Sequence, residues 1–154
     1  MYSRHHAVTS LVVTAILVFF LPPIDVGGVV VPLGIVVAYG TAIGVFIDLD
    51  HFVIARLRTG DWNALRFCVT HPSAAVVDQD RLFDRGDVGL LSRLLSHLLI
   101  TVAVVSVVAV ESTPLGLITG VVLYVHIVTD VAWDIRRLPD DLEDAPEDVL
   151  NALR

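Results

Sequence analysis

The sequence predicts an all-α polytopic membrane protein, a bundle of four transmembrane helices with a cytoplasmic interfacial loop or helix. Three observations lead to this fold class. First, 55% of the 154 residues are hydrophobic, only 18% are charged, and the mean hydropathy is +0.78, whereas soluble domains have about 45–50% apolar and about 25% charged residues. Second, the apolar residues stand in four long runs, and third, the loops between them alternate in arginine content. These features argue against a soluble globular enzyme and against a disordered chain.

Four apolar runs mark the expected transmembrane spans. They cover about residues 7–21, 26–47, 90–110 and 114–133. About 20 helical residues cross a hydrocarbon layer of ~30 Å, so the last three runs are long enough. The first run is short and follows Arg4 as the apolar region of a signal peptide would, but Pro22-Pro23 follows it in place of a small-x-small cleavage site. We interpret it as a first helix that stays in the membrane.

The distribution of arginine predicts the topology. Five arginines lie between residues 51 and 89, and others lie near the two chain ends, whereas the loops Pro22–Asp25 and Glu111–Thr113 contain none. The positive-inside rule places both termini and the 51–89 loop in the cytoplasm of a multi-pass cell-membrane protein. We therefore expect a four-span membrane domain at residues 1–138 and an acidic cytoplasmic tail at 139–154.

The middle loop is expected to contain a short interfacial helix. Trp62, Leu65 and Phe67 stand among arginines there, a pattern typical of a helix lying at the membrane surface. The acidic stretch at 78–87 is expected to be a solvated loop.

The composition also limits the kinds of binding partner and metal site that the chain can have. The formal net charge of −7 disfavours nucleic acid, and the single cysteine, Cys68, excludes an internal disulfide and a cysteine-based zinc site. All ten basic residues are arginine and fourteen of the seventeen acids are aspartate. This composition resembles that of a salt-adapted, haloarchaeal protein, with codon bias alone as the alternative.

Ionisable residues inside or directly at the ends of the predicted spans are candidate site residues, because a charge is costly to bury in lipid. They are His5, His6, Asp48, Asp50, His51, Arg93, His97, His126, Asp130 and Asp134. In the predicted topology they all fall in the cytoplasmic half, with His97 about 10 Å and Asp130 about 9 Å inside the layer, from the helical rise per residue. Chance placement would put some of them in the other half.

Helical spacing indicates that these groups could bind a metal ion. His126, Asp130 and Asp134 recur every four residues and share one helix face, as do Arg93 and His97. Imidazole with carboxylate suits a divalent ion, and without thiolate ligands the candidates are zinc, manganese and iron. An ion with an open coordination position activates water for attack on an ester or phosphoester.

Each group alone has an ordinary explanation. A histidine such as His97 is more often a packing residue than a ligand, and Asp48-Leu49-Asp50-His51 could be a helix end that faces water. Arg93 could extend to the interface, and Asp134 could pair with nearby arginines. The convergence of at least three histidines and three aspartates from four helices at one depth favours a site.

These motifs resemble those of the YdjM-like family of membrane-bound metal-dependent hydrolases, over most of the chain. The family pattern is an early His in the first helix, Pro-Asp-x-Asp-His after the second, Arg-x-x-Thr/Ser-His in a later helix and His-x-x-x-Asp in a final one. The matching elements are His6, Asp48-Leu49-Asp50-His51, Arg93-Leu94-Leu95-Ser96-His97 and His126-Ile127-Val128-Thr129-Asp130. The chain departs from the pattern at Ser92, where the family has His, at the missing glycine after Arg93, and at Ile47, where the family has Pro.

The resemblance implies a metal-dependent hydrolase, with zinc as the first choice of metal, that acts on a lipid-derived or membrane-delivered ester at the cytoplasmic face. A phosphoester is expected, since the family's ligand pattern is similar to that of zinc-dependent phospholipase C. The expected metal ligands are His6, Asp48, Asp50, His97, His126 and Asp130. Asp48 or Asp50 would instead act as a base, Arg93 would hold a phosphate, and His51 and Asp134 would orient imidazoles.

Two other functional classes stay open. One is a non-catalytic membrane protein in which the polar residues form a structural network between helices. The other is a small proton-coupled carrier, which four spans without a pair of broken helices disfavour unless the chain forms an oligomer.

Overall fold

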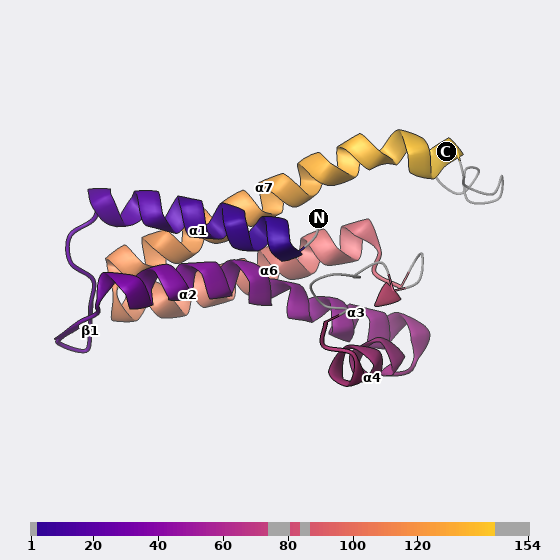
Figure 1. The fold of residues 1–154 in the computed structure, drawn as a ribbon, viewed down its shortest axis with the longest axis horizontal. Coiled ribbons are helices and arrows are strands. Elements are labelled where there is room, and N and C mark those ends of the chain that lie inside the picture. The colour runs from indigo at the N-terminus through magenta and orange to yellow at the C-terminus, as the bar shows by residue number, and fades with distance from the viewer. Residues whose placement is uncertain (1–2, 74–80, 84–86, 144–154) are drawn as a thin grey trace.

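The computed structural model describes residues 3–73, 81–83 and 87–143, with only the backbone described for 138–143. Helices dominate this part of the chain (Figure 1). In chain order the elements are α1 (Ser3–Phe20), β1 (Asp25–Val26), β2 (Val29–Val30), α2 (Leu33–Phe46), the 3₁₀ turn η1 (Ile47–Leu49), α3 (Asp50–Thr59), α4 (Asn63–Thr70), α6 (Leu90–Glu111) and α7 (Thr113–Glu143).

Four helical segments are long and apolar enough to cross a membrane. They are Ser3–Phe20, Leu33–Thr59, Leu90–Glu111 and Thr113–Arg137. The helices α1, α2, α6 and α7 run along the long axis of the molecule (Figure 1), α1 packs on α2, α6 packs on α7, and α7 also contacts α1 and α2. The all-α, four-helix prediction is therefore confirmed.

The distribution of side chains suits a lipid environment. Large apolar side chains point outward, among them Phe19 and Val110, which are 85% and 84% exposed. Polar side chains such as Ser10, Thr14 and Thr119 are instead buried between the helices. A water-soluble fold would bury the first group and expose the second, so this arrangement, with the four apolar helices, suggests a membrane protein.

The second span begins later than the sequence pattern predicted. Residues 25–30 form a two-stranded hairpin, and α2 starts at Leu33 rather than at Val26. The loop of the hairpin is Gly27-Gly28, both with positive φ (59° and 83°), as a two-residue hairpin turn requires, and the Asp25 carboxylate accepts a hydrogen bond from the Gly28 N–H. The predicted span included these two glycines, whereas in the structure they form the turn that precedes the helix.

At its other end the second span continues beyond the predicted boundary at Ile47. The chain passes from α2 through the 3₁₀ turn η1 into α3 and stays helical to Thr59. Gly60, with φ of 85°, ends α3 and donates its N–H to the Arg56 carbonyl, a typical left-handed C-cap. The Asp48–His51 motif therefore lies within a continuous helical segment and not at a helix end that faces water.

The remaining predicted segments agree with the structure in part. The helix α4 lies where the interfacial helix was expected, and the guanidinium of Arg56 lies over the Trp62 ring. The helix α7 extends past the predicted end at Trp133 to Glu143. Most of the acidic 78–87 stretch and the tail after residue 143 lie outside the described residues.

Small residues allow α1 and α2 to approach closely. A Cβ atom at Gly40 would collide with the Thr14 side chain, and one at Gly44 would collide with Ser10. Glycine and small hydroxyl residues are the ones that membrane helices use at such contacts. The α1–α2 contact therefore has two pairs of small residues spaced by one helical turn.

Candidate metal centre

The buried faces of α1 and α2 continue, at the same end of the bundle, to the polar residues of the site. On α1 the buried positions advance in steps of four from Thr14 through Ser10 to His6. On α2 the corresponding series runs through Gly40 and Gly44, and the next step of four reaches Asp48. Residues spaced by four lie on one helix face, so the packing that brings Gly44 against Ser10 also brings Asp48 near His6.

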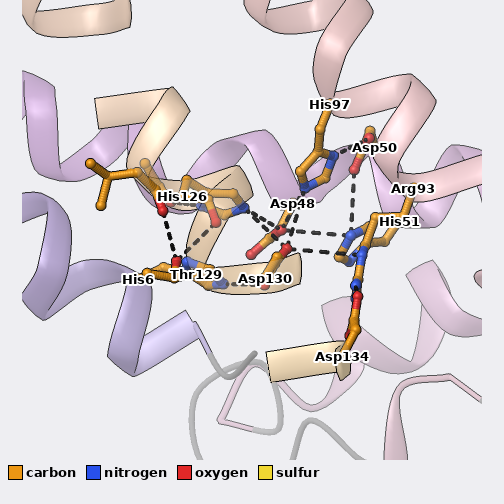
Figure 2. A network of polar contacts seen from close by, with 12 residues as sticks. His6, Asp48, Asp50, His51, Arg93, His97, His126, Thr129, Asp130 and Asp134 are labelled. Carbon is orange, nitrogen blue, oxygen red and sulfur yellow. Dashed lines mark hydrogen bonds and ion pairs between the residues drawn. The ribbon is translucent and has the colours of Figure 1, made fainter. Parts of the chain in front are cut away.

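The other two spans contribute from the same end. On α7, His126 and Asp130 follow the buried residues Val122 and Leu123, and on α6 the buried residue is His97. These side chains converge with their neighbours in one cluster (Figure 2). Its members are His6, Asp48, Asp50, His51, Arg93, His97, His126, Asp130 and Asp134. The structure thus brings together every residue predicted above as a ligand, base, phosphate-binding or orienting residue, whereas His5 packs against Trp133.

His126 has one ring nitrogen committed to the backbone and the other directed at two carboxylates. Its Nδ1 lies 2.8 Å from the carbonyl oxygen of Gly44, so Nδ1 carries the proton that it donates there. Its Nε2 lies 3.3 Å from Asp48 Oδ1 and 3.5 Å from Asp130 Oδ2. This Nε2 is buried and has no hydrogen-bond partner among the described residues. A neutral imidazole in this tautomer therefore presents a lone pair toward two carboxylate oxygens.

His97 repeats this arrangement from α6. Its Nδ1 lies 3.0 Å from Asp50 Oδ2, and its Nε2 lies 3.3 Å from Asp48 Oδ1. A carboxylate that accepts the Nδ1 proton fixes the ring so that Nε2 is free to bind a metal. Asp50 was predicted as a ligand, but the structure places it behind His97, where it orients the ring.

His6 joins the cluster from α1. Its Nε2 lies 3.0 Å from Asp130 Oδ1, and its ring stacks on that of His126 with the ring centres 3.8 Å apart. The side chain is 1% exposed. His6 therefore closes the cluster on the α1 side.

His51 lies nearer to the ligand positions than predicted. Its Nε2 is 3.6 Å from Asp48 Oδ1, and its ring stacks on that of His97 at 5.4 Å. The sequence predicted that His51 only orients an imidazole, but its nitrogen faces the carboxylate shared by the other histidines. His51 and Asp48 are 17% and 15% exposed, so the cluster is open to the molecular surface on their side.

Arg93 and Asp134 form an ion pair beside the cluster. The Arg93 guanidinium binds the Asp134 carboxylate, and its Nε lies 3.9 Å from Asp130 Oδ2. Arg93 was predicted to hold a phosphate and Asp134 to orient an imidazole. In the structure the partner of Asp134 is Arg93, so this pair supports the Asp130 side of the cluster.

The geometry is suitable for a metal ion. In one group, donor atoms of His6, Asp48, His126 and Asp130 all lie within 4.8 Å of one another, and in a second group those of Asp48, His51 and His97 do so. At zinc–ligand bonds of about 2.0–2.1 Å, two ligands of one tetrahedral ion lie about 3.3 Å apart. The contacts of Asp48 Oδ1 with His126 and His97, both 3.3 Å, have this spacing. This buried His/Asp group could therefore hold a metal ion.

The charges of the cluster also favour a cation. Among the described residues, the ion-pair partners of Asp48 and Asp50 are all imidazoles. Two largely buried carboxylates that face neutral imidazoles are unfavourable. Either imidazoles are protonated or a metal ion supplies the positive charge.

One element of the site was not predicted from the sequence. The carbonyl of Gly44 selects the tautomer of His126, and no side-chain pattern marks a backbone acceptor. A weak signal exists, since Gly44 lies four residues before Asp48 and so on the same helix face. A glycine there also allows the close approach of α1.

Comparisons with protein-family models, with curated proteins and with solved structures find no match for this chain.

Proposed function

We propose that this chain is a membrane-embedded, metal-dependent hydrolase that cleaves a lipid-derived or membrane-delivered phosphoester. The observation that carries the proposal is the Nε2 of His126, which is buried between the carboxylates of Asp48 and Asp130 while its Nδ1 proton is held by Gly44. Three groups with electron pairs converge there, and a divalent cation is the natural partner for them. The resemblance of the sequence motifs to the YdjM-like hydrolases supports the same class.

Zinc is the metal that the donor set favours. The donors are imidazole nitrogens and carboxylate oxygens, and Cys68 lies on α4, outside both candidate groups. Histidine with aspartate and spacings near 3.3 Å suit tetrahedral zinc, while manganese and iron accept the same ligands at larger coordination numbers. A bound divalent ion supplies Lewis acidity and activates water.

The residues around the ion have separate tasks in this proposal. Asp50 holds His97 in its ligand orientation and keeps its buried Oδ1 without a hydrogen-bond partner among the described residues. That oxygen makes Asp50 the general base in place of Asp48, which imidazoles enclose on three sides. Arg93 is 18% exposed, is oriented by Asp134, and supplies fixed positive charge for a phosphate at the open side.

The location of the cluster supports a substrate that arrives through the membrane interface. Asp48, Asp50 and His51 of the cluster lie where the second span passes into α3, and Figure 1 shows α3 and α4 at the opposite end of α2 from the hairpin. Apolar surface surrounds the bundle, with solvent access beside His51, Asp48 and Arg93. We assign this end to the cytoplasm, since the arginine-rich segments lie there.

The test is a hydrolysis assay with purified protein in detergent, before and after removal of metal. Phosphatidic acid and phosphatidylglycerol probe phosphoester cleavage, and a monoacylglycerol probes carboxyl-ester cleavage. The expected result is release of phosphate or headgroup by wild type, loss of activity after chelation, and recovery with zinc. Asp25→Asn, at the hairpin, is the matched control for Asp130→Asn in the cluster. Equal activity of the wild type and Asp130→Asn, or cleavage of the carboxyl ester alone, would contradict the phosphoesterase proposal.

A non-catalytic structural network is the second candidate. The direct contact between His6 and Asp130, at 3.0 Å, and the ion pair between Arg93 and Asp134 favour it, since each of these pairs joins two side chains directly. In that case the cluster only fixes the packing of α1, α6 and α7. Wild-type protein that retains no metal after metal-replete growth would support the network and exclude the hydrolase.

A further inference from the structure

The cluster has two halves that share one carboxylate. On one side of Asp48 the rings of His6 and His126 stack with centres 3.8 Å apart, and on the other side His51 and His97 stack at 5.4 Å. Asp48 belongs to both groups of donors that could hold a metal ion. Figure 2 shows Asp48 between the two histidine pairs.

The donors are too numerous for one tetrahedral ion. Six side chains supply donor atoms in the two groups, namely His6, Asp48, His51, His97, His126 and Asp130. A tetrahedral ion takes about four ligands, and a catalytic one keeps one of these positions for water or substrate. A single ion would therefore leave buried donors on one side of Asp48 without a partner.

Each half also has its own hydrogen-bond acceptor that orients a histidine ring. The Gly44 carbonyl fixes His126, and the Asp50 carboxylate fixes His97, so that both Nε2 atoms lie 3.3 Å from Asp48 Oδ1. Such outer partners are typical of metal-binding imidazoles. If only the first half bound an ion, the orientation of His97 by Asp50 would serve no metal ligand.

We infer that the cluster is a two-ion centre bridged by Asp48. His6, His126 and Asp130 would complete the first site, and His51 and His97 the second. This inference rests on the proposed metal-dependent function and extends it, because two-ion sites are frequent among phosphoester hydrolases. The second site is the more open one, since His51 is 17% exposed and His6 is 1% exposed, so a chelator should remove its ion first.

The test counts ions in detergent-purified protein from zinc-replete growth, by elemental analysis. We expect about two zinc ions per chain in the wild type and about one in either His6→Ala or His51→Ala. His71→Ala is the matched control, because His71 is exposed and contacts Thr70 and Phe67 outside the cluster, so two ions should remain. As a readout that needs no variant, the wild type loaded with manganese should give an exchange-coupled electron paramagnetic resonance spectrum.

Different failures have different meanings. Wild type with one ion and an uncoupled manganese spectrum would overturn the two-ion centre and leave the proposed hydrolase intact. Wild type with no ion would overturn both. Two ions without magnetic coupling would show that Asp48 does not bridge the sites. Two ions that persist in His51→Ala would overturn the second site as built from His51 and His97. If a variant loses its helical circular dichroism, the wild-type count and spectrum alone decide.

Discussion

The hydrogen-bond partners of the two ring nitrogens of His126 bear on whether the cluster is a metal site or a polar network. In a network, a buried imidazole donates or accepts at both nitrogens, because an unpaired buried polar atom costs free energy. Here Nδ1 is paired with the Gly44 carbonyl, and Nε2 faces two carboxylate oxygens that accept but do not donate hydrogen bonds when ionised. Either a proton on Nε2 or a cation between these atoms satisfies all three, and the metal content of the protein distinguishes the two.

Asp130→Asn tests this interpretation. The substitution keeps the shape and one oxygen but removes the charge, so bound metal should fall at least about tenfold, since even loss of a partner outside the ligand set costs about 10–100-fold in affinity. If the cluster is only a network, the change should be mild, at about 1 kcal/mol for each altered hydrogen bond. Metal content and melting temperature in detergent distinguish the two.

Asp25→Asn is the control, because the Asp25 carboxylate accepts a hydrogen bond within the hairpin, at the far end of the molecule. Unchanged metal content in Asp130→Asn would contradict the ligand role of Asp130.

How far the sequence predicted the site depends on whether a contact lies within one helix. The spacing of His126 and Asp130 on one face follows from helical periodicity, and the structure confirms their contact at 3.5 Å. The pairing of Asp50 with His97 joins two spans, and only their packing sets which ring atom meets which carboxylate. The sequence therefore predicts both Asp50 and His51 as site residues, but only the structure shows that Asp50 Oδ2 lies against His97 Nδ1, at 3.0 Å.

The helices α1 and α2 show how small residues position the ligands. Ser10 and Thr14 contact Gly44 and Gly40, and the same two faces continue to His6 and Asp48. With little hydrophobic drive between helices in lipid, close van der Waals packing sets their separation. A change at the glycines should therefore alter the ligand positions as well as stability.

Gly44→Ala is expected to destabilise the protein by about 1–3 kcal/mol, because its Cβ would collide with the Ser10 side chain. Gly34→Ala is the matched control in the same helix, since nothing lies within 4 Å of a Cβ there, and better helix propensity should raise stability by up to about 1 kcal/mol. Thermal unfolding followed by circular dichroism measures both. A Gly44→Ala protein as stable as Gly34→Ala would contradict the close α1–α2 contact.

The boundaries of the elements were harder to predict than their existence. Length and hydropathy predicted four long helices, which the structure contains. The hairpin at residues 25–30 was missed because its valines are as apolar as a span, and the two glycines form a turn only through their left-handed φ. The continuation of α2 into α3 was missed because charged residues usually end a span, whereas here they face the interior of the bundle.

In the whole molecule, polar and apolar interior residues are separated along the bundle axis. Near the hairpin the core is apolar, with Ile24, Val36, Ile118 and Val122, and at the other end it consists of the His/Asp cluster. Asp50 and His51 of the cluster belong to α3, so the arginine-bearing helices α3 and α4, which lie away from the hairpin in Figure 1, share the end with the cluster. This polarity and the positive-inside rule together predict that the cluster faces the cytoplasm.

Cysteine labelling tests that orientation, because Cys68 on α4 is the single cysteine of the chain and is partly exposed. A maleimide that does not cross membranes should leave Cys68 unlabelled in intact cells and label it after permeabilisation. Val29→Cys combined with Cys68→Ser moves the thiol to the hairpin, where position 29 is 67% exposed, and this variant should react in intact cells. The opposite pattern would place the cluster on the outer side.

X-ray absorption at the zinc edge of the wild-type protein, purified after zinc-replete growth, tests the metal centre most directly. The expected spectrum shows stoichiometric zinc with nitrogen and oxygen neighbours at about 2.0–2.1 Å, outer scattering from imidazole rings, and no sulfur. This result follows from four histidines and two aspartates as donors, with Cys68 outside the cluster. A sulfur neighbour at about 2.3 Å, or protein that retains no zinc, would contradict a metal centre built from these residues.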